Sequence, residues 1–184
     1  MRKGILILLA MITMIYYADK ANAAFLLEPY AGTQLASTYE TNTSEGDLSG
    51  TAVGLKFGFT KMGFSFGLNG QRNTWNLEPE TGSDSDYTYT RMGAFIGYDS
   101  PLGVRVWGEY VFSFGGVNDD DTDIEQTGGS GTAFGFGYKV LPFLSLNLEL
   151  ATLATTTSVN GDTETDFDVD YQSYLFSVSL PFSI

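Results

Sequence analysis

Apolar and polar residues alternate with a period of two along most of the chain from Leu27 to Ile184. Successive side chains of a strand point to opposite faces, so this alternation indicates β-strands with one apolar face. Turn or loop residues divide the pattern into eight runs, which predicts an all-β protein. We expect strands near residues 25–37, 50–60, 62–75, 87–99, 103–113, 130–140, 144–155 and 171–184.

The connections between these runs alternate between short and long. Three are tight, at 60–62, 99–102 and 140–143, and two of them contain a proline (Pro101 and Pro142), which favours a turn and cannot continue a ladder. An even number of strands with this alternation predicts an eight-stranded antiparallel up-and-down barrel with both termini on the short-turn side. We expect the long polar loops at 38–49, 76–86, 114–129 and 156–170.

We assign 39 alternate positions between Leu27 and Ile184 to one face of the predicted strands, and none of these positions is charged. A charge on the lipid face of a membrane barrel costs roughly 2–4 kcal/mol at the midplane. The length of the runs, about 11 residues, also suits a tilted strand that crosses a bilayer. This face is therefore predicted to contact lipid, and the barrel to be a transmembrane β-barrel.

The opposite face is rich in glycine, serine and asparagine. In a soluble, lipocalin-like barrel this face would meet water, but soluble surfaces are normally rich in lysine and glutamate. Small residues suit the interior of an eight-stranded barrel, which is only wide enough to be filled by side chains. We therefore place this face in the lumen, together with seven charged residues: Glu28, Lys56, Arg91, Arg105, Glu109, Lys139 and Glu149.

Charges inside a narrow lumen are expected to pair, because an unpaired buried ion is costly. Opposing strand directions place Glu28 level with Lys56, and Glu109 within reach of Arg91. A salt-bridge network that plugs the bore is the preferred interpretation, and a narrow ion path is the alternative. Aromatic and aliphatic residues share the inward parity, so a small apolar pocket for a lipid tail is a further hypothesis (Tyr30, Phe95, Trp107, Val111 and Leu175).

The amino terminus resembles an export signal. Arg2 and Lys3 precede an apolar run over residues 4–17, and Ala21-Asn22-Ala23 has the small-x-small pattern that signal peptidase accepts. The run is shorter than the roughly 20 residues of a membrane-spanning helix, which argues against an anchor. We expect a Sec-type signal peptide over 1–23, cleaved after Ala23, and an outer-membrane barrel domain over 24–184.

Composition excludes several classes of function. The chain has 22 Asp+Glu against 9 Lys+Arg, with a net charge of −13, and it contains no histidine and no cysteine. Disulfides, thiolate metal sites and imidazole-based catalysis are therefore excluded. A pI near 4.1 argues against nucleic-acid binding, which needs clustered basic residues. We expect no cofactor.

The acidic residues gather in the four predicted loops, which contain no lysine or arginine. In the third loop, alternate carboxylates at Asp119, Asp121, Asp123 and Glu125 have the oxygen spacing that wraps a hard cation. The loop lacks the glycine and distal glutamate of the full calcium motif. A Ca²⁺ site at these four residues is one hypothesis. Weak collective attraction of divalent ions, which would bridge the loops to lipopolysaccharide, is the other.

Two segments resemble small bacterial outer-membrane barrels of the OmpX and OmpA-barrel type. They are residues 137–150 (GYKVLPFLSLNLEL), which read as strand, turn and strand, and residues 28–32 (EPYAG). The resemblance implies an eight-stranded fold in the outer membrane of a Gram-negative bacterium. Such proteins typically end on an aromatic residue read by the outer-membrane assembly machinery, whereas this chain ends on Ile184, with Phe182 at the same parity.

Three classes of function remain. The preferred one is a non-enzymatic surface or structural protein whose acidic loops contact partners, divalent ions or lipopolysaccharide. The alternative is a narrow channel, or a barrel that binds a lipid or small hydrophobic ligand. A membrane-embedded enzyme ranks last, because the general base that such hydrolases commonly use is histidine and the chain has none.

Overall fold

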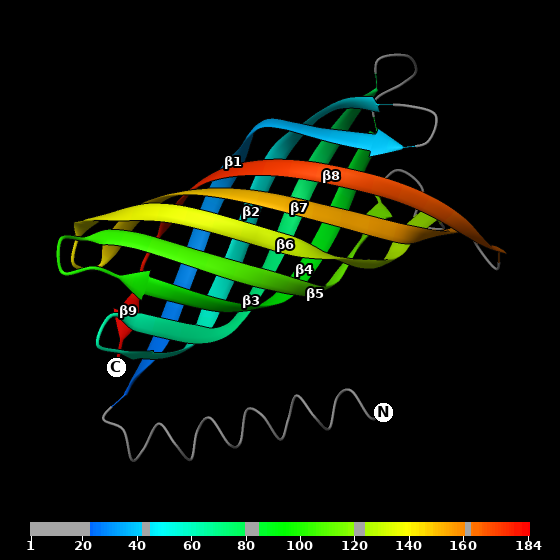
Figure 1. Ribbon diagram of the computed structural model, residues 1–184. Coiled ribbons are helices and arrows are strands. Elements are labelled where there is room, and N and C mark those ends of the chain that lie inside the picture. The colour runs from blue at the N-terminus through cyan, green and yellow to red at the C-terminus, as the bar shows by residue number, and fades with distance from the viewer. Residues whose placement is uncertain (1–22, 42–44, 80–84, 120–123, 161–162) are drawn as a thin grey trace, which may run out of the picture.

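The computed structural model describes residues 23–41, 45–79, 85–119, 124–160 and 163–184. Within these ranges the chain is built from strands (Figure 1). No helix among the described residues is long and apolar enough to cross a membrane. The strands are β1 (Ala24–Thr41), β2 (Glu45–Lys61), β3 (Phe64–Pro79), β4 (Ser85–Asp99), β5 (Val104–Asn118), β6 (Ile124–Leu141), β7 (Leu144–Asn160), β8 (Thr163–Ser179) and β9 (Phe182–Ser183).

The strands close into a ring. Each of β1 to β7 pairs antiparallel with the next one along the chain, and β8 pairs with β1, which closes the ring. The short β9 continues the line of β8 along β1, with Leu27 opposite Phe182. The predicted eight-stranded up-and-down barrel is confirmed, and the start of β1 lies at the same end as β9 (Figure 1).

The strands reach much further than predicted at one end of the barrel. Residues 38–41, 45–49, 76–79 and 114–118, which were expected to be loop, are strand. The same holds for 124–129, 156–160 and 163–170. The sequence pattern did not indicate these extensions, because their outward side chains are polar and the apolar alternation is therefore lost. Their backbone groups still need hydrogen-bond partners, which the strand ladder provides. We call this the hairpin end and the opposite one the turn end.

The turn end has the tight connections that the sequence predicts. The connection of β2 to β3 has positive φ at both central residues, 53° at Met62 and 86° at Gly63. Positive φ at both positions defines the two-residue turn that matches the twist of a hairpin. A glycine with positive φ, Gly103, also closes the turn that contains Pro101.

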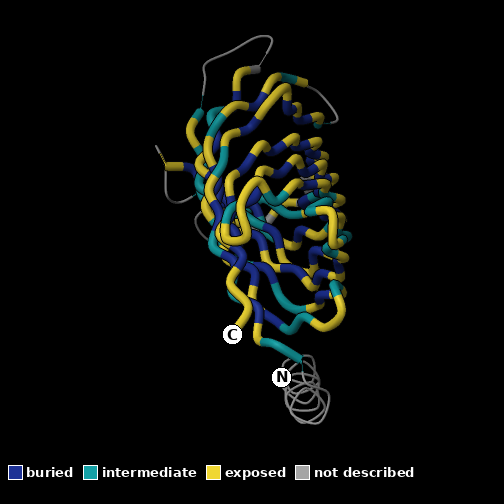
Figure 2. Tube along the Cα trace, turned by 90° about the vertical axis from the view of Figure 1, so that its left-hand side faces the viewer, coloured by how far each residue is buried: buried dark blue, intermediate teal, exposed yellow. Residues whose placement is uncertain are grey.

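The apolar face of the strands lies outside the barrel. Buried and exposed residues alternate along each strand (Figure 2), and the large apolar side chains occupy the exposed positions. This sidedness contradicts a lipocalin-like barrel, in which those side chains would fill the interior. We call the outward band the apolar belt; its large residues include Val53, Leu55, Phe57, Phe64, Phe66, Met92, Ile96, Tyr98, Val106, Tyr110, Phe134, Phe136, Tyr138, Leu146, Leu148, Leu150, Tyr174, Phe176 and Val178.

A ring of polar residues ends the belt on the side of the hairpins. Its members point outward and are exposed, and on β2, β4, β6, β7 and β8 each is the next outward residue after the last apolar one. We call it the polar ring; it consists of Thr33, Thr51, Arg72, Thr90, Thr132, Thr152 and Gln172. Beyond it the outward residues include acidic ones, as at Asp47, Glu78 and Asp170, and Leu35 of β1 is an apolar exception.

The predicted signal peptide remains a prediction, because residues 1–22 lie outside the part of the chain that the structure describes. The described residues begin at Ala23, and β1 starts at Ala24.

Candidate functional site in the barrel lumen

Small residues in the barrel wall make room for large side chains in the lumen. A Cβ added at Gly135 would overlap the Trp107 ring, and one added at Gly54 would overlap the Tyr30 ring. Glycine is therefore needed at these positions so that an aromatic side chain from a neighbouring strand can lie flat against the wall. The small inward residues seen in the sequence leave the space that these large side chains fill.

The charged residues nearest the turn end form a closed cluster. Arg105 makes a bidentate pair with Glu28, at 2.6 and 2.7 Å, and its Nε donates to Asp99 Oδ1 at 2.9 Å. Lys139 Nζ lies 2.6 Å from the other Asp99 oxygen. Paired, bidentate geometry is the arrangement that offsets the cost of removing these ions from water.

Asp99 was not predicted as a lumenal charge, because it lies where the predicted strand 87–99 meets the predicted turn 99–102. It is the last residue of β4 and points inward, opposite Arg105 of β5. With Asp99 included, the lumenal charges balance: Glu28, Asp99, Glu109 and Glu149 against Lys56, Arg91, Arg105 and Lys139. An excess of bases over acids at the inward positions was the available signal that one acid was missing.

A second cluster lies deeper in the lumen, around Arg91. Its Nη2 lies 2.6 Å from Glu149 Oε1 and 3.1 Å from Glu109 Oε2. Trp107 Nε1 donates to the second oxygen of Glu149 at 2.9 Å, and Asn69 Nδ2 donates to Glu109 Oε2 at 2.8 Å. The sequence placed Glu109 within reach of Arg91; it offered no sign of the shorter contact with Glu149.

Lys56 lies among the aromatic side chains that the sequence grouped as an apolar pocket. Its ammonium is 3.7 Å from the centre of the Trp107 ring, 5.6 Å from that of Tyr30 and 5.9 Å from that of Phe95. Such distances are typical of cation–π contacts. Lys56 is opposite Glu28 in the register, but its ion pair is with Glu149, at 4.0 Å. The space proposed for a hydrophobic ligand thus holds a lysine.

The hairpin half of the lumen is filled by an aromatic cluster that the sequence analysis did not identify. Trp75, Tyr89, Phe114 and Tyr171 pack with ring centres 4.7 to 5.9 Å apart. The Tyr89 and Tyr171 hydroxyls lie 2.7 Å apart, and both contact Gln126 Oε1. Phe114 and Gln126 fall in a predicted loop, and register shifts in β5 and β6 change the inward parity before each of them, so the sequence pattern could not have indicated them.

Aliphatic residues complete this cluster. Val111, one of the inward residues named above, belongs to it together with Leu48, Leu77, Leu153 and Val169. Leu175 lies nearer the turn end, in a separate small cluster with Tyr30 and Ala52. The lumen therefore has two layers, a charged one toward the turn end and an aromatic one toward the hairpin end.

Little empty space remains between these side chains. A cavity of about 10 Å³, bordered by Glu28, Lys56 and Trp107, is near the smallest volume that holds one water. Three buried polar atoms have no partner among the described residues: Asn73 Nδ2, Arg91 Nε and Glu109 Oε1. Single ordered waters would satisfy such atoms.

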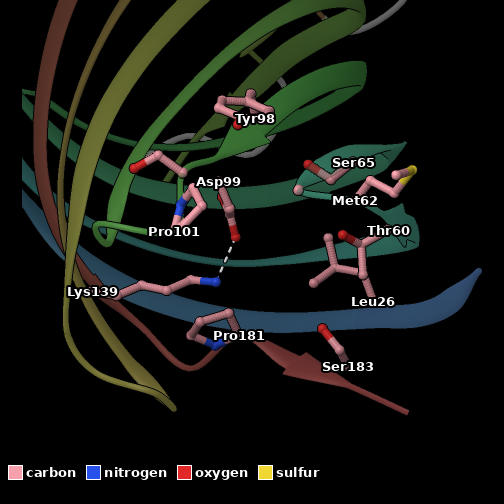
Figure 3. Close-up of a pocket in the computed structure, with 12 residues that line it drawn as sticks. Leu26, Thr60, Met62, Ser65, Tyr98, Asp99, Pro101, Lys139, Pro181 and Ser183 are labelled. Carbon is pink, nitrogen blue, oxygen red and sulfur yellow. Dashed lines mark ion pairs between the residues drawn. The ribbon is translucent and has the colours of Figure 1, made fainter.

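Two larger hollows open at the ends of the barrel. The one at the turn end, about 370 Å³, is crossed by the Asp99–Lys139 ion pair and bordered by Leu26, Met62 and Pro181 (Figure 3). The other, about 410 Å³, lies between β1, β2 and β3 at the hairpin end and is lined by Glu40, Glu45, Asp47 and Glu78. Neither hollow continues through the two layers of the lumen as a described cavity.

The predicted Ca²⁺ site lies partly outside the described residues, which omit Asp121 and Asp123. Asp119 accepts a hydrogen bond from Thr88 at 3.1 Å, and Glu125 is on β6 opposite Val117. Among the residues that the structure describes, no group of three or more acidic side chains is arranged to hold a metal ion. The site remains a prediction.

The barrel is similar in structure to several solved outer-membrane proteins. OprG from Pseudomonas aeruginosa has a TM-score of 0.53 at 13% identity, over 88% of this chain and 97% of that chain. Neisserial surface protein A has a TM-score of 0.48 at 15% identity (87% and 99%), and Ail from Yersinia pestis one of 0.48 at 13% (87% and 98%).

No protein-family model and no curated protein sequence matches the chain. At such low identity the likeness to OprG concerns the fold alone. It agrees with the resemblance noted in the sequence. The chain has the fold of the small eight-stranded outer-membrane β-barrels.

Proposed function

We propose that this protein is an integral outer-membrane barrel with a closed lumen, which acts without catalysis as a rigid support for four acidic hairpins at the cell surface. The observation that carries the proposal is the filling of the lumen by two successive layers. Balanced ion pairs centred on Arg91 and Arg105 occupy one layer, and the Trp75 cluster occupies the other. Such an interior stabilises a barrel and leaves no described path for ions.

The membrane location is supported by the apolar belt. A soluble protein rarely exposes a contiguous apolar surface larger than a few hundred Å², whereas the belt surrounds the whole barrel. In this orientation the hairpin end faces the exterior and the turn end faces the periplasm. The C-terminal Phe182, held against Leu27 of β1, is the residue we propose for recognition by the outer-membrane assembly machinery.

The hairpins are the proposed interaction surface. Acidic residues face each other across neighbouring strands: Glu40 lies opposite Glu45 and Asp170, and Asp47 lies opposite Glu78. Like charges in such positions repel and destabilise the sheet. A divalent cation would relieve this repulsion, and it would also bridge the carboxylates to the phosphates of lipopolysaccharide. We propose lipopolysaccharide and divalent ions, including Ca²⁺, as the partners.

A conductance measurement tests the closed lumen. The refolded protein, shown to be folded by its altered gel mobility before boiling, is inserted into planar bilayers. We expect no discrete conductance steps, while a folded Arg91→Ser/Glu109→Ser/Trp75→Ala variant serves as the opened control. Reproducible steps in the wild-type protein that change when Arg91 alone is replaced would favour the narrow channel instead.

The surface role has its own test. Binding of lipopolysaccharide to the protein in detergent is measured with Mg²⁺ and with a chelator. We expect the Mg²⁺-dependent part to be lost in a Glu40→Gln/Asp47→Asn/Glu78→Gln variant and to persist in a Thr156→Ala control on β7. Binding that ignores both Mg²⁺ and these substitutions would refute this role.

A further inference from the structure

We propose that the turn end of the barrel inserts into the interfacial layer of the periplasmic leaflet, so that phospholipid is the partner of its three turns and its C-terminus. This inference rests on the outer-membrane location proposed above and adds where the barrel stands in the bilayer. It assigns a binding role to the tips of turns that would otherwise face water.

The tips carry apolar side chains that nothing in the described structure covers. Met62, Leu102 and Ile184 are 87%, 82% and 83% exposed, the highest values among the large apolar residues described. Phe143, in the third turn, is 54% exposed. Turns normally carry polar residues, and four apolar tips at one end of a barrel form a surface that water disfavours.

The height of the apolar belt explains why these tips are needed. On β7 the belt consists of Leu144, Leu146, Leu148 and Leu150, and Thr152 of the polar ring follows. Four alternate positions cover about eight residues, or roughly 26 Å of strand, and a tilt of 35–45° reduces this to a height of about 20 Å. Barrels of this type present an apolar band about 25 Å tall. The deficit of about 5 Å matches the reach of one further apolar residue at each turn.

The apolar surface is continuous from the belt into the turns. Phe64, which follows the Met62 turn, packs on Tyr98 with ring centres 4.8 Å apart, and Phe25 packs on Phe59 at 5.9 Å. These rings lie at the turn end of β1, β2, β3 and β4. Aromatic girdles mark the membrane interface in such barrels, which places the tips at the depth of the lipid headgroups and glycerol.

The charges at this end agree with a lipid partner. Lys61 is exposed beside Met62, where its stem can lie along the apolar surface while its ammonium reaches a lipid phosphate. Asp99 and Lys139 are occupied by each other inside the mouth, so they present little net charge to the leaflet. The acidic residues that would repel anionic lipid lie at the opposite end, as at Asp47 and Glu78.

Single-cysteine fluorescence quenching tests the proposal on the full barrel. Because the chain has no cysteine, Met62→Cys and Leu102→Cys each give one labelling site for a bimane probe. The variants are refolded into vesicles of phosphatidylethanolamine and phosphatidylglycerol with no other protein present. Leu148→Cys in the belt is the lipid-exposed control, and Ser49→Cys at the hairpin end is the water-exposed control.

We expect nitroxide-labelled lipids to quench both tip probes, and aqueous iodide to quench them about fivefold less than the Ser49 probe. Tip probes that iodide quenches as strongly as the Ser49 probe, while the Leu148 probe stays lipid-quenched, would overturn this inference; the tips would then face water or await a periplasmic protein. Loss of lipid quenching at Leu148 as well would refute the outer-membrane location itself.

Discussion

Arg91 and Glu149 stand 58 positions apart in the chain, yet their side chains meet across the lumen at 2.6 Å. Arg91 belongs to β4 and Glu149 to β7, two strands that are not neighbours in the ring. Arg91 also contacts Glu109 of the neighbouring β5, so the cluster joins β4 and β5 to β7, with which neither shares a ladder. The lumen therefore contributes tertiary contacts that a two-dimensional sheet alone lacks.

Replacing Arg91 alone should lower the stability of the barrel more than replacing Arg91 together with its acidic partner. We expect Arg91→Met to lower the free energy of unfolding by about 3–5 kcal/mol, since two carboxylates lose their partner in a buried site. Adding Glu109→Gln should restore much of that loss, because Glu149 keeps its ion pair with Lys56 and no carboxylate of the cluster is then left without a base. Urea unfolding in lipid vesicles, followed by tryptophan fluorescence, measures both values. An Arg91→Met/Glu109→Gln variant less stable than Arg91→Met would contradict the pairing.

Gly135 should tolerate no side chain. Gly135→Val places its side chain where the Trp107 ring lies, so the ring must move and its hydrogen bond to Glu149 is lost. We expect a destabilisation of about 1–3 kcal/mol, as for other overpacked sites, and altered Trp fluorescence. Gly70→Ala is the matched control, because its new Cβ meets nothing within 4 Å. Equal stability of the two variants would refute the close approach of Trp107.

The fold could be predicted from the sequence because its signal is repeated on every strand. From Leu144 to Leu150 each second residue is leucine, and a one-residue slip would exchange lipid-facing and lumenal positions. The hairpin extensions could not be predicted in this way. Past the polar ring the outward side chains are polar, so strand and loop look alike, although Tyr89 and Tyr171 continue the inward parity.

The members of the candidate site were largely predictable and their partners were not. Parity alone placed Lys56 and Glu28 inside, and their strands put them in register. Which acid each base meets depends on side-chain reach across the lumen, where Arg105 captures Glu28 and Lys56 turns toward Trp107. That choice is set by contacts between strands distant in the chain, for which a single sequence carries no pattern.

The aromatic layer should stabilise the barrel through packing. We expect Trp75→Ala to cost about 3–5 kcal/mol, since Trp75 is 1% exposed and contacts three other rings. Tyr171→Phe removes only a hydroxyl that meets Tyr89 and Gln126, which should cost about 1 kcal/mol. Both values come from the same unfolding experiment. Identical losses for the two variants would show that packing is not what Trp75 provides.

A charge should be tolerated at the hairpin end and not in the belt. We expect Leu148→Arg to destabilise the membrane-inserted barrel by about 2–4 kcal/mol, and Thr156→Arg on the same strand by at most about 1 kcal/mol. Both side chains point outward and are exposed, so the difference reports on the surrounding medium. Equal effects of the two substitutions in vesicles would show that Leu148 does not face lipid.

The sidedness of the strands is tested most directly by a nitroxide scan of residues 144–151 on β7 in lipid vesicles. Collision with oxygen, which is concentrated in lipid, is compared with collision with a water-soluble nickel complex. We predict that labels at Leu146, Leu148 and Leu150 collide with oxygen, and that labels at Asn147 and Glu149 are shielded from it. Oxygen contact at Asn147 and Glu149, with shielded leucines, would contradict the account.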